Sequence, residues 1–539
     1  MEFSKSFISK QLEMAASLHI SGELDKAELI YKKIINFDAN SKEAFHLLGL
    51  LMYQKSEYIV SENLIRNAIS LDSNVPAFYS DLGNSLKMQG RQIEAIECYK
   101  KALKLDQNCL EGHYNYANEL MALNKSDEAI SHYKLAIAQN PNIPEIHYNL
   151  GIAFAKKEQY YEASQSYKNA INLKPDYYDA YFNLAHIADS MGELDEAIKF
   201  YKKAIDAKPY APEAHFDMSL TLLRLGDYKN GWNEYEWRLL KKDKIKTFTN
   251  KILWRGEPLL GKKLLIQHEQ GIGDSIQFIR YAELAKNRGG YIIFETKPSL
   301  FRLFKNVKGI DELVECGNHN IDFDFYIPIL NLPKAFLTTW ETVPAEVPYI
   351  YPEEKLVNQW LQKFQSIKGF KIGICWQGNP KNTSDSKRSV PLKYFNSLFG
   401  IENTNFISLQ KQYGNDQLSY FKAEKALIDF SNELDENTGA FIDTAAVMKN
   451  LDLVITVDTA IAHLAGAIGV PVFLVLTHPP TEWRWGYDAD VVPWYPTMFV
   501  FRQKQSGDWG ELFYRIKESL KIFKWFKNIY LPQSSKEIF

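Results

Sequence analysis

A repeat of 34 residues over the first 240 positions constrains the fold of this chain more than any other feature of its sequence. Small side chains return at this interval, at Ala15, Gly49, Gly83, Ala117, Gly151, Ala185 and Ser219. A second small residue follows twelve positions after each of them, and a large side chain, mostly tyrosine, follows four positions later. Small residues let two antiparallel helices approach closely, while the large side chain fills the space between neighbouring pairs. The period therefore predicts a stack of seven helix pairs.

The pattern resembles the tetratricopeptide repeat, whose period and small, small, aromatic signature extend here from about residue 8 to 241. Prolines at positions 141, 175 and 209 are expected to end second helices of the pairs. The last unit departs from the pattern, with Gly231, Trp232 and Arg238 at key positions. We interpret this unit as the joint to a following domain.

One polar residue in each of five units stands two positions before the small residue of the first helix. These residues are Asp81, Asn115, Asn149, Asn183 and Asp217. In the resembled family first helices line a concave groove, which implies that these side chains hold the backbone of an extended protein acceptor. Solvated positions or hydrogen bonds between repeats explain the same residues equally well.

From residue 262 the hydrophobic pattern changes from helix pairs to short apolar runs separated by helical segments. KKLLIQHE and YIIFET are expected to be strands joined by the helix SIQFIRYAELAKNRG, and further strands are expected in KIGICWQG, NFISLQ, ALIDF, DLVITVD and VPVFLVLT. The predicted fold is an α-helical repeat solenoid over residues 1–241, followed by two α/β lobes over 242–355 and 356–508. A closing helix and tail take up 509–539.

The segment HEQGIGDSIQF follows the first of these strands. Gly271 and Gly273 permit a turn in which backbone approaches a ligand, and Asp274 is expected to open the next helix at the ligand-binding edge of the sheet. A carboxylate there can act as a general base. Asp274 followed by Gln277 also matches a capping box, which satisfies the free amides of the helix with no catalysis implied.

A second ligand-binding turn is expected where the strand DLVITVD ends at Asp458 and a helix begins at Thr459. The free amides of such a helix start, including that of Ala460, suit a diphosphate, and Thr459 adds a hydroxyl. His463 lies one turn further on, where it can reach the phosphate or the leaving group, although a histidine on an apolar helix is usually structural. Asp458 would repel phosphate, so we expect it to cap the helix or hold a sugar hydroxyl.

Two cations, Lys387 and Arg388, lie in the loop NPKNTSDSKRSVPL and can offset the charge of a diphosphate. A solvated basic loop is the alternative explanation. An aromatic cluster is formed by Trp483, Trp485, Trp494 and Tyr495. These side chains can pack against a sugar or base, or form ordinary core.

Charge and cysteine content exclude several classes of function. Lysine and arginine number 63 against 66 acidic residues, so the chain lacks the positive excess that nucleic acid binding needs. The four cysteines form no CxxC pair, which indicates neither a zinc site nor a disulfide framework. The absence of a signal peptide pattern and of a membrane span leads us to expect a cytoplasmic protein.

Three segments together resemble glycosyltransferase family 9, which includes the ADP-heptose heptosyltransferases, over residues 250 to 520. They are HEQGIGDSIQF, the run DTAAVMKNLDLVITVDTAIAHLAGAIGVP, and WRWGYDADVVPWYPTMFVFRQ. The resemblance implies the GT-B fold, with a nucleotide-sugar as co-substrate and neither metal nor other cofactor. It also implies that Asp274 is the base.

The same resemblance places Asp458, Thr459, Ala460 and His463 in the family's diphosphate-binding pattern, in which Ala460 stands in place of the usual glycine. It further implies a cation before the donor-side helix. Either Lys387 or Arg388 would supply that cation.

The layout of repeats before a GT-B enzyme resembles two protein-modifying systems, the O-linked N-acetylglucosamine transferases and the flagellin glycosyltransferases of some bacteria. We therefore predict an inverting O-glycosyltransferase that modifies serine or threonine of a protein acceptor, with flagellin as the preferred candidate. Two alternatives stay open: a heptosyltransferase-like enzyme of lipopolysaccharide or other glycan synthesis, and a non-catalytic repeat scaffold.

Overall fold

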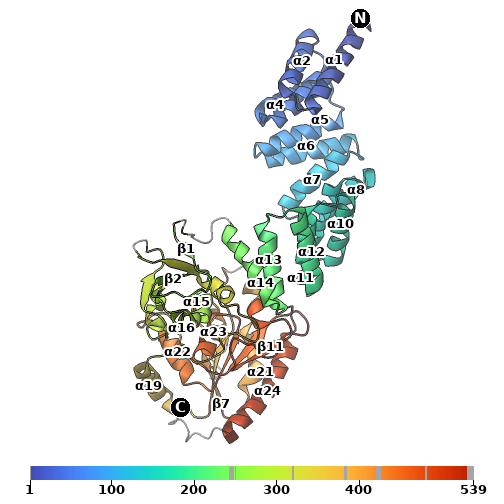
Figure 1. The fold of residues 1–539 in the computed structure, drawn as a ribbon. Coiled ribbons are helices and arrows are strands. Elements are labelled where there is room, and N and C mark those ends of the chain that lie inside the picture. The colour runs from blue at the N-terminus through green and yellow to red at the C-terminus, as the bar shows by residue number, and fades with distance from the viewer. Residues whose placement is uncertain are drawn as a thin grey trace. The chain divides into compact units, whose positions relative to one another are not determined.

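A computed structural model of the chain describes residues 2–241, 248, 250–318, 321–381, 385–420, 427–479 and 482–530. The chain divides into two compact units, Met1–Ala188 with Lys199–Pro209, and Asp189–Ile198 with Tyr210–Phe539. The first unit is built of helices, coloured blue to teal in Figure 1, and the second combines helices with two parallel sheets.

The repeat region consists of consecutive antiparallel helices of 13 or 14 residues after a longer first helix. Their bounds are α1 (Glu2–Ile20), α2 (Leu24–Phe37), α3 (Lys42–Gln54), α4 (Tyr58–Leu71), α5 (Pro76–Met88), α6 (Gln92–Leu105), α7 (Leu110–Ala122), α8 (Ser126–Gln139), α9 (Pro144–Lys156), α10 (Tyr160–Leu173), α11 (Tyr178–Ser190), α12 (Leu194–Ala207) and α13 (Pro212–Arg224). The predicted period of helix pairs is confirmed.

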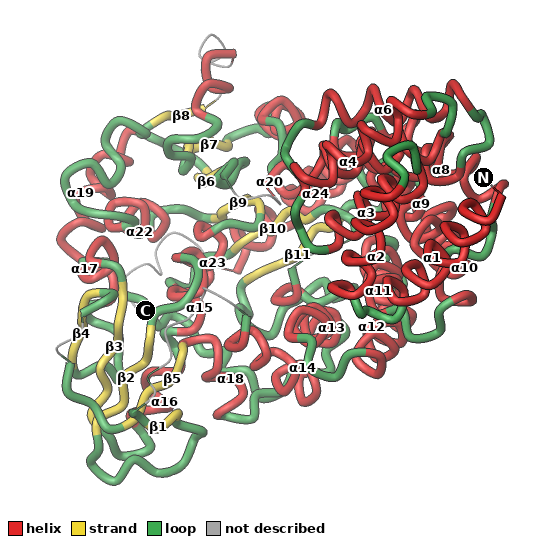
Figure 2. Tube along the Cα trace, turned by 90° about the horizontal axis from the view of Figure 1, so that it is seen from above, coloured by secondary structure: helices red, strands yellow, loops and turns green. Residues whose placement is uncertain are grey.

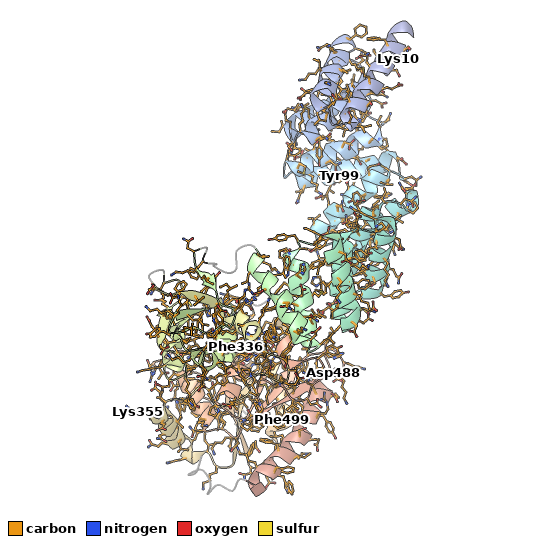
Figure 3. The ribbon with its side chains drawn as sticks, in the orientation of Figure 1. Lys10, Tyr99, Phe336, Lys355, Asp488 and Phe499 are labelled. Atoms are coloured by element: carbon orange, nitrogen blue, oxygen red, sulfur yellow. The ribbon has the colours of Figure 1, made fainter. Side chains whose placement is uncertain are left out.

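Close packing between the two helices of a pair explains the small residues of the repeat. A Cβ atom on Gly151 would lie 2.5 Å from the ring of Tyr167. A Cβ atom on Gly83 would lie 2.5 Å from the ring of Tyr99. Both tyrosines are almost fully buried, and Tyr99 is marked within the array in Figure 3. The glycine therefore makes room for the aromatic ring of the second helix.

Proline marks helix boundaries in the array, as predicted. Helices α8, α10 and α12 each end two residues before a proline, at positions 141, 175 and 209. Three further prolines occupy the first position of α5, α9 and α13, where a missing backbone N–H costs nothing.

The seventh helix pair belongs to the second compact unit. Helix α14 (Tyr228–Tyr235) is shorter than the other second helices and continues as a 3-10 helix over Glu236–Leu240. The indole N–H of Trp232 donates to the carbonyl of Thr338 at 2.9 Å, and the Arg238 guanidinium pairs with Glu269. The predicted boundary at residue 241 is the end of the repeat period. The second compact unit begins earlier in the chain, because it includes the seventh helix pair.

The first sheet of the second unit has five parallel strands in the order β1-β5-β2-β3-β4. The strands are β1 (Ile252–Leu253), β2 (Lys263–Gln267), β3 (Tyr291–Thr296), β4 (Glu312–Glu315) and β5 (Phe325–Pro328). The predicted β2 and β3 are confirmed. The helix expected between them is instead two helices, α15 (Ile272–Phe278) and α16 (Tyr281–Lys286), and the short helices α17 (Phe301–Phe304) and α18 (Leu332–Ala335) follow β3 and β5.

The second sheet has six parallel strands in the order β11-β10-β9-β6-β7-β8, and Figure 2 shows β9, β10 and β11 side by side. They are β6 (Phe370–Cys375), β7 (Thr404–Ser408), β8 (Leu427–Asp429), β9 (Leu453–Val457), β10 (Val472–Leu476) and β11 (Met498–Arg502). Helices α19 (Glu354–Lys363), α20 (Asp385–Arg388), α21 (Asn396–Phe399), α22 (Ile442–Lys449), α23 (Ala460–Ala467) and α24 (Trp509–Tyr530) accompany it. The five strands predicted here and the closing helix are confirmed.

One hydrophobic core joins the parts of the second unit. It contains Trp232 of the seventh helix pair, Ile266 of the first sheet and Val454 of the second sheet. The described part of the chain contains no helix long and apolar enough to cross a bilayer.

We predict that Gly151→Ala lowers the free energy of unfolding of the repeat array by about 1–3 kcal/mol, because the added methyl group displaces the Tyr167 ring. Urea unfolding followed by circular dichroism of the full chain measures this. In a Tyr167→Leu background, which frees the space, the same substitution should cost less than half as much. An equal cost in both backgrounds would contradict the packing explanation.

Candidate active site

The two parallel sheets each have a point where the direction of chain progression reverses. In the first sheet this point lies between β2 and β5, and in the second it lies between β6 and β9. Parallel α/β sheets bind ligands beyond the carboxyl ends of their strands at such points. Asp274 lies in the first segment after β2, and Thr459 in the first segment after β9.

The structure brings these two segments together, because helix α15 packs against helix α23. A Cβ atom on Gly273 would lie 3.0 Å from Cδ2 of His463 and 3.8 Å from Cα of Ala460. The turn that carries Asp274 and the start of α23 therefore meet across one interface, with Gly273 at the point of closest approach.

The two glycines of this turn are not needed for a left-handed backbone. Neither adopts a left-handed conformation, and the positive φ of the turn falls on Gln270, at 62°. Gly271 precedes the first residue of α15 with an extended φ of −90°. A Cβ atom on Gly273 would press against His463, so the missing side chain favours the close approach of the two helices.

Asp274 lies within the first turn of α15, whose first residue is Ile272. The prediction that Asp274 opens the helix and pairs with Gln277 in a capping box is therefore wrong. Asp274 Oδ2 instead reaches back and accepts from the backbone N–H of Gly271 at 2.8 Å. The carboxylate still satisfies a free amide at the helix start, but from the third helical position rather than the cap.

Both oxygens of Asp274 have a donor, since Oδ1 accepts from the Arg484 guanidinium. Burial raises the pKa of Asp274, and the positive charge of Arg484 opposes this rise. The side chain keeps 15% of its surface exposed. A carboxylate has about four lone-pair positions, so two remain for a hydroxyl proton arriving from the exposed side.

Arg484 is the main residue of this site that the sequence analysis missed. It follows Trp483 in a short 3-10 helix after β10 and is 6% exposed. Its guanidinium pairs with Asp274 and Glu482, and its Nε donates to Oε1 of Gln277 at 2.6 Å. The segment WRWGYD contains a signal for it, because an arginine between two tryptophans that are expected to be buried needs an acidic partner.

Asp458 lies directly after β9 and is surrounded by charge. Burial and the neighbouring Glu482 carboxylate raise its pKa to about 6, while Arg388 acts in the opposite direction. A carboxyl with this pKa is partly protonated near neutral pH, so it repels an approaching phosphate less than an ordinary aspartate does.

Thr459 is the N-cap residue of α23 and makes no capping bond with its own side chain. Its hydroxyl is buried, and it has no hydrogen-bond partner among the residues that the structure describes. The helix itself begins at Ala460, one residue later than predicted. The start of α23 thus combines an unused hydroxyl with the free amides of a helix terminus.

His463 is buried at 6% exposure, where Nδ1 lies 3.0 Å from the hydroxyl of Tyr495 and the ring stacks on Trp485. Burial, reinforced by the charges of Arg484 and Arg280, holds the pKa of His463 well below its usual range. The imidazole is therefore neutral at physiological pH. It can offer a hydrogen bond to a phosphate but no positive charge.

The structure describes the side chain of only one of the two predicted cations, Arg388. The Arg388 guanidinium lies close enough to oppose the rise in the pKa of Asp458, and its Nε donates to Asp385 at 3.2 Å. The side chain of Lys387 lies outside the described part of the chain. The predicted aromatic cluster is core, because its side chains are at most 3% exposed: Trp483, Trp485, Trp494 and Tyr495.

Three of the polar residues predicted to line the repeat groove make hydrogen bonds to the preceding repeat. Asp81 accepts from His46 at 2.7 Å, and Asn149 donates to the hydroxyl of Tyr114 at 3.1 Å. Asn183 donates to the hydroxyl of Tyr148 at 3.3 Å. These bonds match the alternative of contacts between repeats, and they leave the side chains partly exposed. Asn115 and Asp217 are also partly exposed.

Family comparisons identify the helical array. Residues 76–109 and 178–210 match the family described as tetratricopeptide repeat, and residues 117–158 and 153–188 match the family described as TPR repeat. The helical array consists of tetratricopeptide repeats. Protein FlbA of Caulobacter vibrioides is 26% identical over 333 residues, which are 56% of this chain and 54% of FlbA. The chain therefore spans about half the length of this relative.

Solved structures of repeat proteins are also similar to parts of the chain. The crystal structure of MamA is 30% identical and covers 30% of this chain and 93% of its own, with a TM-score of 0.29. YrrB, described as a TPR protein with an unusual peptide-binding site, is 21% identical and covers 35% of this chain and 98% of its own, with a TM-score of 0.32. PilF of Pseudomonas aeruginosa is 16% identical and covers 40% and 98%, with a TM-score of 0.37.

We predict that Asp458→Asn removes a pH dependence of stability. A carboxyl whose pKa rises from 3.8 to about 6 on folding takes up a proton in the folded state. The free energy of unfolding therefore falls as the pH rises from about 4 to 6, and above pH 6 the ionised carboxylate destabilises the folded state by about 3 kcal/mol at most.

The measurement is the free energy of unfolding in urea at pH 4.5 and pH 7.5. Relative to the wild type, Asp458→Asn should gain stability at pH 7.5 and little at pH 4.5, whereas the control Asp416→Asn, at an exposed position of the same lobe, should follow the wild type at both values. A gain of the same size at both pH values would exclude the assigned pKa.

Proposed function

We propose that this chain is a glycosyltransferase of the GT-B type that transfers a sugar from a nucleotide-sugar donor to serine or threonine of a protein acceptor. The observation that carries the proposal is the meeting of α15 and α23, which unites the carboxyl-end edges of two parallel sheets. A GT-B enzyme needs this arrangement, because the donor binds one sheet and the acceptor reaches it from the other. The resemblance to glycosyltransferase family 9 supports the same reading.

In the proposed reaction Asp274 takes the proton of the acceptor hydroxyl. The hydroxyl oxygen forms a bond to the anomeric carbon of the donor, and the bond from that carbon to the diphosphate oxygen breaks with its electron pair. Attack on the face opposite to the leaving group inverts the anomeric configuration. The raised pKa of Asp274 makes it a stronger proton acceptor than an exposed carboxylate.

The donor diphosphate would lie at the start of α23. The amides there, the buried hydroxyl of Thr459 and the Arg388 guanidinium supply positive or hydrogen-bond-donating groups, and the high pKa of Asp458 weakens the opposing charge. Arg484 holds Asp274 in place and is near enough to the same interface to respond when an anion binds. Neither metal nor other cofactor has a step in this mechanism.

The tetratricopeptide repeats would hold the acceptor protein. Stacked first helices present one partly exposed polar side chain per repeat, as at Asn149 and Asn183, and amide groups bind extended backbone with little demand on its sequence. Flagellin is the acceptor that we propose, on the resemblance in layout to the flagellin glycosyltransferases.

The test is transfer by the purified full chain. A panel of nucleotide-sugars is supplied with flagellin, release of the nucleotide is measured, and the mass of intact flagellin reports sugar addition. Transfer to lipopolysaccharide fragments in place of protein would favour the heptosyltransferase-like alternative. Failure to bind or cleave any donor would favour the other alternative, a non-catalytic repeat scaffold.

We predict that Asp274→Asn lowers kcat about 10²–10⁴-fold and changes the KM for the donor little, because the amide keeps the size of the side chain but accepts no proton. Asp322→Asn, at a carboxylate that is 85% exposed, is the matched control and should retain wild-type turnover. Near-normal transfer by folded Asp274→Asn would show that another group is the base.

A further inference from the structure

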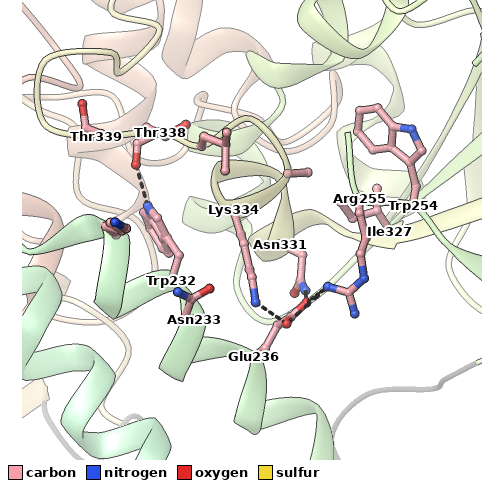
Figure 4. Close-up of a pocket in the computed structure, with 13 residues that line it drawn as sticks. Trp232, Asn233, Glu236, Trp254, Arg255, Ile327, Asn331, Lys334, Thr338 and Thr339 are labelled. Carbon is pink, nitrogen blue, oxygen red and sulfur yellow. Dashed lines mark hydrogen bonds and ion pairs between the residues drawn. The ribbon is translucent and has the colours of Figure 1, made fainter. Parts of the chain in front are cut away.

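The second compact unit contains a cavity of about 440 Å³ between the seventh helix pair and the first sheet (Figure 4). One wall is the seventh helix pair, with Trp232 and Glu236, and the other comes from the first sheet and the helix after β5, with Trp254 and Lys334. Ile327 of β5 forms part of the floor. The cavity thus lies at the carboxyl ends of β1 and β5, the edge of the sheet that also carries Asp274 after β2.

Two almost fully buried tryptophans, Trp232 and Trp254, belong to the walls of the cavity. Trp232 and Trp254 are 3% and 1% exposed, and both indole N–H groups are already used, by the carbonyls of Thr338 and Glu257 at 2.9 Å each. Neither indole N–H is therefore free to bind an occupant, and both rings are almost entirely covered by neighbouring residues. Leu337 adds an apolar side chain that is 81% exposed. This lining suits a large apolar side chain.

The charged groups around the cavity are predominantly positive. The Glu236 carboxylate accepts from Arg255 and Asn331 at 3.1 Å each, and it also pairs with Lys334 (Figure 4). Lys229 is exposed, and no ion pair is described for it among the residues that the structure covers. The lining thus contains three cations, Arg255, Lys334 and Lys229. Its one carboxylate already pairs with two of them, so the site favours a negatively charged occupant.

A set of polar contacts leads from the cavity to Glu269, in the segment between β2 and Asp274. Asn331 donates to Glu236 on the cavity side and accepts from Arg238 on the other. Arg238 forms two bonds of 2.7 Å with Glu269, which lies five residues before Asp274 in the same segment. All three of Asn331, Arg238 and Glu269 are at most 4% exposed. Two buried side chains, Asn331 and Arg238, therefore connect the cavity to the segment that leads to the proposed base.

We propose that this cavity binds a segment of the acceptor protein that carries a large apolar side chain next to an acidic residue. The apolar side chain would lie against the exposed Leu337, and the acidic group would pair with Lys229 at the rim. The exposed rim allows a continuing chain to enter and leave. This inference rests on the proposed function, since it assigns to the acceptor a subsite on the Asp274 side.

The test uses a photoreactive peptide and needs no donor. N-acetyl-(p-benzoyl)Phe-Asp-Ser-amide is irradiated with the full chain, and the crosslinked residues are mapped by mass spectrometry. We expect crosslinks at Leu337 and at the segments containing Trp232 or Trp254. N-acetyl-Phe-Asp-Ser-amide should compete at a concentration about fivefold lower than its Asn analogue.

Two variants with matched controls check the contacts. Lys229→Glu should weaken competition by the acidic peptide about fivefold to tenfold, while Lys308→Glu, at an exposed lysine of the same compact unit, should not. Leu337→Asn should weaken it about threefold, while Leu260→Asn should not. The two leucines are well matched, because both have a φ of 51° and are 81% and 86% exposed.

Crosslinks outside the cavity, or equal competition by the acidic and amide peptides, would overturn the proposal. Competition by 3-phenylpropionate as strong as that of the peptide would show a site for a small aromatic carboxylate and overturn it as well. Binding of the peptide by a chain that transfers no sugar would disprove the enzyme function but keep the subsite. Transfer that is unaffected by Lys229→Glu and Leu337→Asn would disprove the subsite alone.

Discussion

The close approach of α15 to α23 is the contact on which the arrangement of the second unit depends. It is favoured by the missing side chain at Gly273, because a Cβ atom there would lie only 3.0 Å from the His463 ring. It also requires that His463 be neutral, since a charged imidazole in this buried position would face Arg484 and Arg280. Burial and close packing thus bring the ends of two separate sheets to one place.

The charges at this interface balance one another only as a group. Asp274 and Glu482 share the Arg484 guanidinium, and Asp458 has its pKa raised by burial and by Glu482. A buried charge is tolerated when it has partners, and removal of one partner leaves the others exposed to the full cost of desolvation. Under the proposed function an arriving diphosphate would change this balance, which gives donor binding a direct route to the carboxylate of Asp274.

The seventh helix pair belongs to the same compact unit as the α/β fold. Its aromatic residues enter the common core, and Arg238 is buried against Glu269, in the segment that leads to Asp274. A removable adaptor would not bury a guanidinium in its neighbour. The last repeat therefore contributes to the support of the candidate active site, and the cavity beside it is a consequence of this junction.

Local sequence patterns determined the repeat array, the two α/β lobes and several of their strands, because periodicity and buried apolar runs reflect the contacts of neighbouring residues. They also singled out Gly273, Asp274, Ala460 and His463, which the structure brings together. The strands β1, β4, β5 and β11 were not predicted. The first three are two to four residues long, and such short runs carry little pattern, whereas β11 has five residues.

Only the tertiary structure decided which residues meet across long intervals of sequence. Arg484 lies 210 residues after Asp274, and nothing in either local pattern points to the other. The same holds for Glu236 and its partners Asn331 and Lys334, 95 and 98 residues further along. Ion pairs of this kind arise when two sheets and a helix pair bury their faces against each other. The sequence therefore determined the elements and their chemistry, and packing determined which charges are paired.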